Sequence, residues 1–509
     1  MNNENPKQDM CIFCGKKARG NCPALKTAIC SYCCGSKRND SVNCGNDCEF
    51  NVLSVRGYDA ILKIDEVLTR KMHERVLSAC GREKFEKTIA RLTSAIEGNP
   101  ETYGNDAYNA LLFLMFIEPG AGGATLARQW AAASWEGMTN DEKAVMKYKK
   151  DTLKMTIIEI QKIIDHQILE CVDLLEDKNK KFIVVDRSLA QSAARFMRLL
   201  IWIARYPYYC SLFGAGIEIT DFVESEFMDG LYLAYNREKD KNPGWTLNYF
   251  LAANCGKLLQ KQYSLVEKKH KNILQKMDLH QCKAVYEIKD NFKKVKEILD
   301  TLPEFEAREK GFGGKPAEGD LYYCWVRRGE SKAIEKNMPA AFRHSDDESF
   351  GVGLLANVTL NARVLLVETF TKQKYEFLKK MAAKYFKGLA VLADEIIVDL
   401  AKQMAKKVGR GEEEAELMPQ KTVEELPHEV KAEVMRKFNR NFYEKFLDDN
   451  IPALNGLTPR QAAKDKKMRP ALVELMKVHL KGMEKRNKSE NFGLNIDWVL
   501  DELNLRELK

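Results

Sequence analysis

The chain has 509 residues, enough for three or four domains of roughly 100–200 residues each. With 45% hydrophobic and 30% charged residues it has a globular composition, which excludes a low-complexity or fibrous chain. Its net charge of +8 permits nucleic-acid or acidic partners but requires neither. The polar first residues hold no secretory signal, and the longest apolar run, Ala110–Ile117, is far shorter than the roughly 20 residues of a membrane span. We therefore expect a soluble protein without a membrane partner.

The N-terminal segment is dominated by cysteine, because eight of the 14 cysteines of the chain lie between Cys11 and Cys48. Two C-x-x-C pairs, Cys11/Cys14 and Cys30/Cys33, are separated by 15 residues. This spacing is typical of a tetrahedral zinc site with four cysteine ligands, because the two sulfurs of each pair can face the same ion. The other cysteines of the segment would complete a second site: Cys22, Cys34, Cys44 and Cys48.

The adjacent residues Cys33 and Cys34 favour two interleaved sites, because their side chains diverge and so suit different ions. The sequence therefore predicts two structural Zn²⁺ ions bound by all eight cysteines. One four-cysteine site with four spare thiols is the first alternative, and a redox or iron–sulfur role is the second. A shell of four cysteines is closed to water, so catalysis at the metal is not expected.

Residues 1–50 contain too few apolar side chains to fold by burial alone, so metal binding must supply the missing free energy. Metal binding also changes the charge of this segment. Seven Lys/Arg and five Asp/Glu give +2, and eight thiolates around two Zn²⁺ ions bring the charge to about −2. This argues against interpreting the segment as a basic, DNA-binding zinc finger.

Part of the segment resembles a cysteine-rich module with a CxxCCGxxR core that occurs in uncharacterised bacterial proteins. The residues that carry the resemblance are Cys22–Leu25, Ile29–Arg38 and Cys44–Cys48. The resemblance implies a structural zinc in a bacterial protein, and it implies no activity.

The six remaining cysteines stand singly in apolar surroundings and are expected to be reduced core residues. This cysteine usage indicates a reducing compartment, so we expect the protein to be cytoplasmic. These residues are Cys80, Cys171, Cys210, Cys255, Cys282 and Cys324.

Residues 51–150 are expected to be helical, because apolar residues recur there at helical spacing. Gly81 interrupts the first helical run, and Ala107–Ile117 predicts a further helix. The glycine-rich stretch at 119–123 is not a phosphate-binding loop, since no Gly-Lys-Ser/Thr follows it, and we expect a turn.

From residue 151 the pattern changes to a mixture of helices and short hairpins. A charged turn between two apolar runs predicts a β-hairpin, and a hairpin followed by a helix recurs further along the chain. The expected helices are Met155–Leu169, Asp186–Tyr206 with Ser188 as N-cap, 226–300 and Lys372–Val398. The expected strands are 169–175, 182–186, 214–220, 321–328, 354–360 and 363–369.

The stretch Lys257–Lys296 is rich in lysine and is interpreted first as a solvated helical face. Lys268–Lys271 adds a compact basic patch to it. A nucleic-acid-binding regulator that uses this face and the zinc module is therefore an alternative function. Its binding would weaken steeply with salt.

Residues 409–427 are acidic and bracketed by proline, and we expect an exposed linker there. Beyond it, Asn441–Ala463 resembles a small helical domain with a pALxGxTPreAa signature in cytosolic bacterial proteins. A similar sequence motif occurs in the toxin-binding domains of certain antitoxins. The resemblance implies a protein-interaction module over residues 428–509 without a catalytic residue. Thr458 as N-cap and Pro459 at the first helical position predict a helix start there.

No catalytic constellation is visible in the sequence. The seven histidines show no metal-binding or catalytic spacing, and no G-x-S-x-G motif occurs. His344–Glu348 is the richest local group of titratable side chains. A metal-dependent hydrolase or nuclease that uses acidic residues such as Asp186 or Asp346 is a further alternative, but an enzyme is not favoured.

Together these patterns predict an α+β, predominantly helical protein. We expect a zinc-binding cytosolic bacterial adaptor or regulator that binds another protein through residues 428–509, with nucleic acid as another partner. A stress- or phage-defence role would suit this architecture by loose analogy. The expected divisions are 1–50 (zinc module), 51–150 (helical), 151–300 (α+β, ending in basic helices), 301–408 (hairpin plus helix), 409–427 (acidic linker) and 428–509 (helical interaction domain).

Overall fold

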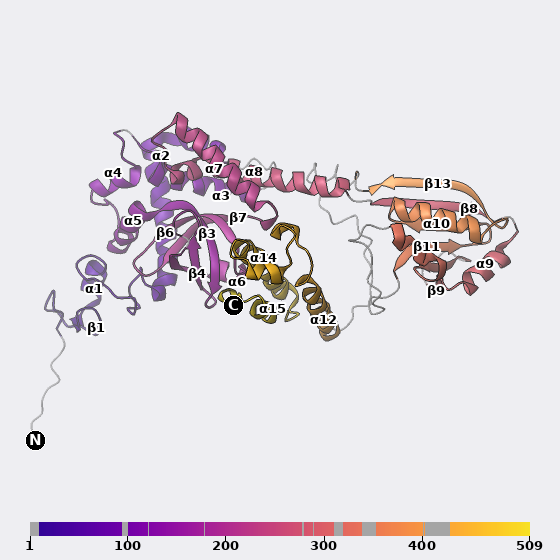
Figure 1. Cartoon of the computed structure of the whole chain (residues 1–509). Coiled ribbons are helices and arrows are strands. Elements are labelled where there is room, and N and C mark those ends of the chain that lie inside the picture. Colours follow the sequence, from indigo (N-terminus) through magenta and orange to yellow (C-terminus); the bar gives the residue numbers. More distant parts are fainter. Residues whose placement is uncertain are drawn as a thin grey trace, which may run out of the picture. The chain divides into compact units, whose positions relative to one another are not determined.

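The computed structural model describes residues 10–93, 100–120, 122–177, 179–276, 279–288, 290–309, 319–337, 353–400, 402 and 428–509. They form two compact units, each with its own hydrophobic core (Figure 1). Unit 1 comprises residues 1–265 and 426–509, and unit 2 comprises residues 266–425. Helices and strands occur together, so the mixed α+β class is confirmed. The expected linker at 409–427 and the group His344–Glu348 lie outside the described residues.

The cysteine module contains one small hairpin and one short helix. Strand β1 (Gly20–Cys22) pairs antiparallel with β2 (Thr27–Ile29), and α1 (Ser31–Lys37) follows. The buried residues of this module are mostly cysteines, joined by Ala18, Ile29 and Val42. Such a small apolar core agrees with the composition of the segment and stabilises it little by itself.

A layer of helices follows the module, as the helical spacing predicts. Within α2, Gly81 has φ 75° and ψ 160°, which kinks the helix at the break seen in the sequence. The elements are η1 (Val55–Gly57), α2 (Tyr58–Leu92), α3 (Pro100–Leu112), the π-helical turn η2 (Phe113–Ile117), α4 (Leu126–Ala132) and α5 (Asn140–Thr152).

Five strands after α5 close into a barrel in the order β3-β4-β5-β7-β6 (Figure 1). Strands β5 and β7 are parallel, and the other neighbours are antiparallel. This connectivity, with a helix between β5 and β6, is that of an OB-type barrel, and a fold alone does not assign a function. The elements are β3 (Lys154–Ile163), β4 (Ile168–Asp173), β5 (Lys181–Val185), α6 (Arg187–Ser192), β6 (Arg198–Arg205) and β7 (Cys210–Glu218).

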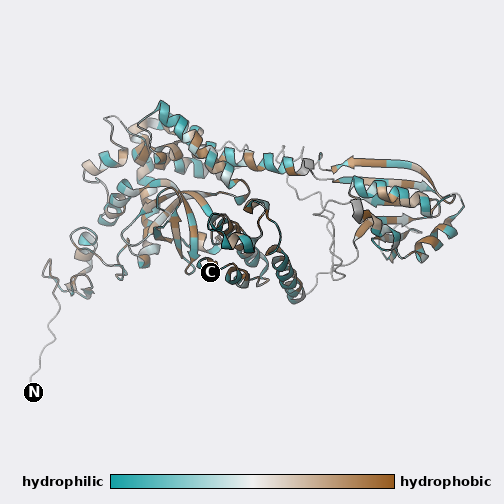
Figure 2. Ribbon diagram, in the orientation of Figure 1, coloured by the Kyte–Doolittle hydropathy of each residue, from teal (hydrophilic) through white to brown (hydrophobic). Residues whose placement is uncertain are grey.

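The barrel strands are buried on both faces. Ile158 and Ile201 belong to one apolar cluster with the other side chains of the barrel interior. Their neighbours Ile157 and Trp202 belong to the cluster that includes the N-terminal helices. The strands therefore carry apolar residues on both faces, which are brown in Figure 2, although the buried polar residues Thr156 and Glu159 interrupt β3. Among the described residues, no helix combines the length and the apolarity needed to cross a membrane.

This double burial explains two wrong predictions. The helix expected at Met155–Leu169 is strand β3, and the helix expected at Asp186–Tyr206 is only the short α6, followed by β6. When both faces of a strand are buried, the regular alternation of apolar and polar residues is lost, so the segment is easily taken for a buried helix. The N-cap of α6 is Asp186 and not Ser188, because the Asp186 carboxylate accepts a 2.7 Å hydrogen bond from the Leu189 N–H. The predicted hairpin is confirmed as β4–β5.

The C-terminal helices belong to unit 1, together with the barrel. The capping box of Thr458 and Gln461 confirms the predicted helix start. Lys481 and Lys485 on α14 each lie 2.5 Å from a carboxylate near the end of β7, Asp221 and Glu218. The elements are α12 (His428–Phe446), η8 (Pro452–Leu454), α13 (Pro459–Lys464), α14 (Arg469–Glu490), α15 (Asp497–Glu502) and η9 (Arg506–Leu508), while η3 (Asp221–Val223), α7 (Glu224–Lys241) and α8 (Leu247–Lys276) connect to the barrel.

The stability of these helices is expected to depend on pH through His479. Burial lowers the pKa of His479, whose Nδ1 lies 2.9 Å from the hydroxyl of Tyr443. The unfolded histidine therefore binds its proton at a higher pH than the folded one. Stability should then fall as the pH drops through the unfolded pKa of about 6.5. Thermal unfolding of the wild type and of His479→Gln between about pH 8 and pH 5 measures this, and equal pH slopes would contradict it.

Unit 2 is an antiparallel sheet in the order β13-β8-β12-β11-β10-β9. Trp325 and Tyr375 are fully buried in its core. The elements are β8 (His280–Glu287), α9 (Phe292–Thr301), β9 (Phe305–Arg308), β10 (Leu321–Val326), η4 (Gly329–Asn337), β11 (Leu354–Leu360), β12 (Val364–Thr369), α10 (Lys372–Tyr385) and β13 (Val391–Asp399).

Long-range pairing overturns two further helix predictions in this unit. Strand β8 interrupts the helix expected over 226–300, and α10 ends at Tyr385 before β13, although a helix was expected to Val398. The two strands pair with each other across about a hundred positions of sequence, which no local pattern shows. Lys257–Lys296 is therefore a helix, a strand and a second helix rather than one helical face. The predicted boundary after residue 300 falls inside unit 2.

Candidate metal centre

The cysteines of the two C-x-x-C pairs meet at one point of the module. The sulfurs of Cys11, Cys14, Cys30 and Cys33 all lie within 4.8 Å of one another, and those of Cys14 and Cys30 are 3.7 Å apart. A tetrahedral zinc ion with Zn–S bonds of about 2.3 Å separates its sulfurs by roughly 3.8 Å. The four cysteines can therefore hold a single metal ion.

Two local structures bring the pairs together. Gly15 has φ 66°, which allows the chain to turn back directly after Cys14. Cys30 is the N-cap of α1, and its sulfur accepts a 3.4 Å hydrogen bond from the backbone N–H of Cys33. The second pair is thereby formed by the first turn of a helix, and β2 carries it to the first pair.

The four thiols of this first set differ in their affinity for protons. Hydrogen bonds from backbone N–H groups, that of Cys30 first, lower the pKa of Cys11 to about 6. Burial raises the pKa of Cys33 to about 12, and hydrogen bonds with the neighbouring cysteines add to the rise. Thiolates so close together repel each other, so a bound cation must replace protons here.

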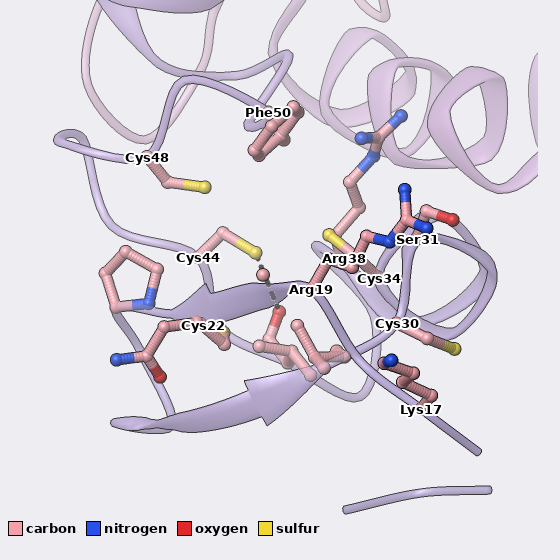
Figure 3. A pocket seen from close by; sticks show the side chains of 15 residues that line it. Lys17, Arg19, Cys22, Cys30, Ser31, Cys34, Arg38, Cys44, Cys48 and Phe50 are labelled. Carbon is pink, nitrogen blue, oxygen red and sulfur yellow. Dashed lines mark hydrogen bonds between the residues drawn. The ribbon is translucent and has the colours of Figure 1, made fainter. Parts of the chain in front are cut away.

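The other four cysteines line one cavity of about 730 Å³ (Figure 3). In the part of the chain that the structure describes, only the first set has all its ligand atoms within 4.8 Å, so this second set is more open. Burial is the main cause that raises the pKa of Cys34 and of Cys44, and the charges of two other cysteines raise both further. The second set comprises Cys22, Cys34, Cys44 and Cys48.

Three basic residues also line this cavity, namely Lys17, Arg19 and Arg38 (Figure 3). The charge of Arg38 opposes the rise in the pKa of Cys34, because a cation nearby favours the thiolate. The cavity therefore combines the four sulfurs of the second set with basic side chains, whose positive charge stabilises thiolates. Arg38 is the arginine of the CxxCCGxxR core, whereas Lys17 and Arg19 stand outside any motif in the sequence.

Contacts with distant residues hold the module in place. The guanidinium Nε of Arg38 donates to Asp141 on α5 at 2.6 Å, and the Asn140 side-chain amide donates to the carbonyl of Arg38 at 2.7 Å. The Tyr208 hydroxyl donates to the carbonyl of Cys44 at 2.9 Å. Because Asp141 and Tyr208 lie more than 100 positions from their partners, no local signal in the sequence could have found them.

The remaining sequence candidates have structural contacts. Asp186 caps α6, and Arg187 donates to Asp59 at 3.1 Å and to Gln167 at 3.3 Å. Asp346 lies outside the described residues. Of the six single cysteines, five are buried and Cys80 is half-buried, in agreement with their assignment as core residues.

The first cysteine set presents four sulfur ligands and no carboxylate, which suits a soft metal ion such as Zn²⁺ better than Mg²⁺ or Ca²⁺. The second set places four more sulfurs around a neighbouring cavity. In comparisons with known proteins, no family model matches the sequence, and neither a curated protein nor a solved structure matches it.

Proposed function

We propose that this chain is a zinc-stabilised protein that acts by binding another protein. The observation that carries the metal part of the proposal is the convergence of four cysteine sulfurs within 4.8 Å. Four thiolates fill a tetrahedral shell and leave no position for water or substrate, so the metal has a structural role. The ion would link the turn after Cys11 to the start of α1 and supply folding free energy that the small core lacks.

The spacing of the sulfurs also bears on which metal is bound. Sulfurs that all lie within 4.8 Å of one another enclose one ion, whereas an iron–sulfur cluster needs a separate cysteine on each iron. Zn²⁺ takes four thiolates in a tetrahedral shell and has no redox chemistry. A single structural zinc in the first set is therefore part of the proposal.

A second zinc ion is proposed for the cavity in Figure 3. Four thiolates around one Zn²⁺ carry a net charge of −2, which a partly buried site must offset. Lys17, Arg19 and Arg38 line the same cavity and supply positive charge. Binding would draw the four sulfurs closer together than they lie now. Arg38 would then link the second centre to α5 through Asp141.

The partner surface is proposed on helix α12. Val434, Phe438 and Phe442 follow each other at four-residue intervals and are 57%, 47% and 45% exposed. An exposed aliphatic and aromatic stripe of this kind is typical of a helix that docks in a partner's groove. The helix also carries five Lys/Arg against three Glu, which favours a protein partner with an acidic rim around its apolar groove.

Affinity purification from bacterial lysate with the full chain as bait tests the partner surface. Val434→Glu and Phe442→Glu are expected to release a protein that the wild type retains, because a carboxylate cannot enter an apolar groove without a partner charge. Leu62→Glu is the matched control, since Leu62 is 47% exposed on α2. Point variants are preferable to removal of residues 428–509, because α14 is joined to the barrel by ion pairs. Retention of the protein by both α12 variants would contradict this surface.

A further inference from the structure

A polar cavity lies in unit 1, away from the cysteine module, between α3, the end of β7 and α8. Its volume is about 340 Å³, which is within the range of small-molecule sites. The cavity opens to solvent beside Tyr263 and Asn105, which are both exposed. Leu259 and Ile217 provide an apolar wall.

Two polar atoms of the lining have no hydrogen-bond partner. Gln262 is only 5% exposed, and its side-chain N–H donates to the carbonyl of Glu218 at 2.6 Å, which fixes the orientation of the amide. Its Oε1 is buried without a partner, and so is the hydroxyl oxygen of Thr220. Buried polar atoms are almost always satisfied in proteins, so the Gln262 oxygen, which can only accept, points to a ligand that donates a hydrogen bond. The Thr220 hydroxyl can accept or donate and can pair with the same ligand.

Asp106 adds a buried acid to the same cavity. It is 6% exposed, and burial raises its pKa while a hydrogen bond with Thr93 opposes the rise. The residues that line the cavity, all within the described part of the chain, include no lysine, arginine or histidine. The other acidic side chain of the lining, Glu218, is paired with Lys485 at 2.5 Å. The cavity therefore holds negative charge without a cation of its own.

The C-terminal end of α2 strengthens this polarity. Leu92, the last residue of α2, lines the cavity, and the last carbonyl groups of a helix carry partial negative charge. Gly256 of α8 lets the two helices approach here, since a Cβ at this position would lie 2.2 Å from the Leu92 carbonyl oxygen. The end of α2 thus adds partial negative charge at the edge of the cavity.

We propose that this cavity binds a small organic cation with a primary ammonium or guanidinium group. The charged group would donate to Asp106, to Gln262 Oε1 and to Thr220, while a short methylene chain would lie against Leu259 and Ile217. A cation offsets the buried carboxylate and satisfies the two free acceptors at once. An anion would be repelled by Asp106 and find no basic partner in the lining.

Isothermal titration of the full chain with agmatine and with putrescine tests this directly. We expect saturable binding of at least one of the two, and no binding of glutamate or inorganic phosphate. Asp106→Asn should weaken amine binding by tenfold or more, since it removes the charge but keeps the shape of the side chain. Thr220→Val should weaken it less. Asp151→Asn, an exposed acid on α5, is the matched control and should leave binding unchanged.

Each outcome decides the proposal. If neither agmatine nor putrescine gives binding heat when titrated into the wild-type chain at millimolar concentration, the proposal is overturned, and no variant is needed for that conclusion. Equal affinity of Asp106→Asn and the wild type overturns it as well, provided that the two unfold at similar temperatures. If Asp106→Asn fails to fold, loss of affinity in Thr220→Val supports the cavity, and unchanged affinity in that variant places the amine elsewhere.

Discussion

Replacing Cys33 with serine is expected to remove the zinc ion proposed for the first cysteine set and to unfold the cysteine module. Cys33 is buried, and its sulfur lies within 4.8 Å of three other cysteine sulfurs. A serine hydroxyl is a poor zinc ligand, and structural zinc in small fingers contributes on the order of 10–16 kcal/mol to folding. Elemental analysis of the purified chain should show the lost ion. Limited proteolysis should then cut within residues 10–50.

Two further variants show whether one ion or two are bound. Cys44→Ser should remove only the ion of the second set, because Cys44 lines the cavity in Figure 3. Cys80→Ser is the control, since Cys80 is half-buried and belongs to neither set. An unchanged zinc content in Cys44→Ser would mean that the second set binds no metal. A wild-type chain with less than about one zinc ion and freely reactive native thiols would refute the metal proposal as a whole.

Replacing Arg198 with methionine is expected to destabilise unit 1 by about 3–5 kcal/mol, because it leaves a buried carboxylate without its main partner. Arg198 on β6 lies 2.5 Å from Glu159, which is 1% exposed, and also pairs with Glu224 and with Glu474 of α14. Without it, the remaining cation on Glu159 is Lys477, at 2.8 Å. Urea unfolding should show the lower midpoint, and hydrogen exchange should show that α14 loses protection.

The matched control for this prediction is Arg82→Met. Arg82 pairs with Glu86 one turn away on the exposed side of α2, and its loss should change stability by less than about 0.5 kcal/mol. The same ion pairs should make the stability of unit 1 depend on pH. Burial tends to raise the pKa of Glu474, but the charges of Arg198 and Lys477 lower it overall. The stability that Glu474 gains from these two cations is therefore present above the usual glutamate pKa of about 4.5, and it is lost as the pH falls below that value. Equal unfolding midpoints for Arg198→Met and Arg82→Met would refute the argument.

The barrel surface bears on the choice of partner. OB-type barrels commonly bind oligonucleotides on their strands and loops. Here Tyr208, in the turn between β6 and β7, donates a hydrogen bond to Cys44 of the cysteine module. Glu159 on β3 forms an ion pair with Lys477 of α14. These contacts occupy the turn and one position of β3, so less of the barrel surface is open to an oligonucleotide. We therefore keep a protein as the proposed partner.

The sequence by itself determined the features that depend on neighbouring residues. The C-x-x-C spacing identified the cysteines that converge, because a metal site of this kind needs only two short turns. The glycine kink at Gly81 and the helix start at Thr458 were equally local, since backbone conformation and capping involve only a few adjacent residues. The β4–β5 hairpin joins strands separated by a short turn, and it was found for the same reason.

Only the tertiary structure decided what depends on burial and on distant partners. Met155–Leu169 became a strand because the closed barrel buries both of its faces, which erases the alternation that marks a strand. Strand β8 was hidden because its two partners, β12 and β13, both follow far along the chain. The Arg38–Asp141 contact and the polar cavity around Asp106 join elements far apart in the chain. Such residues come together only when the chain folds, so no pattern within a short window of sequence can predict their contacts.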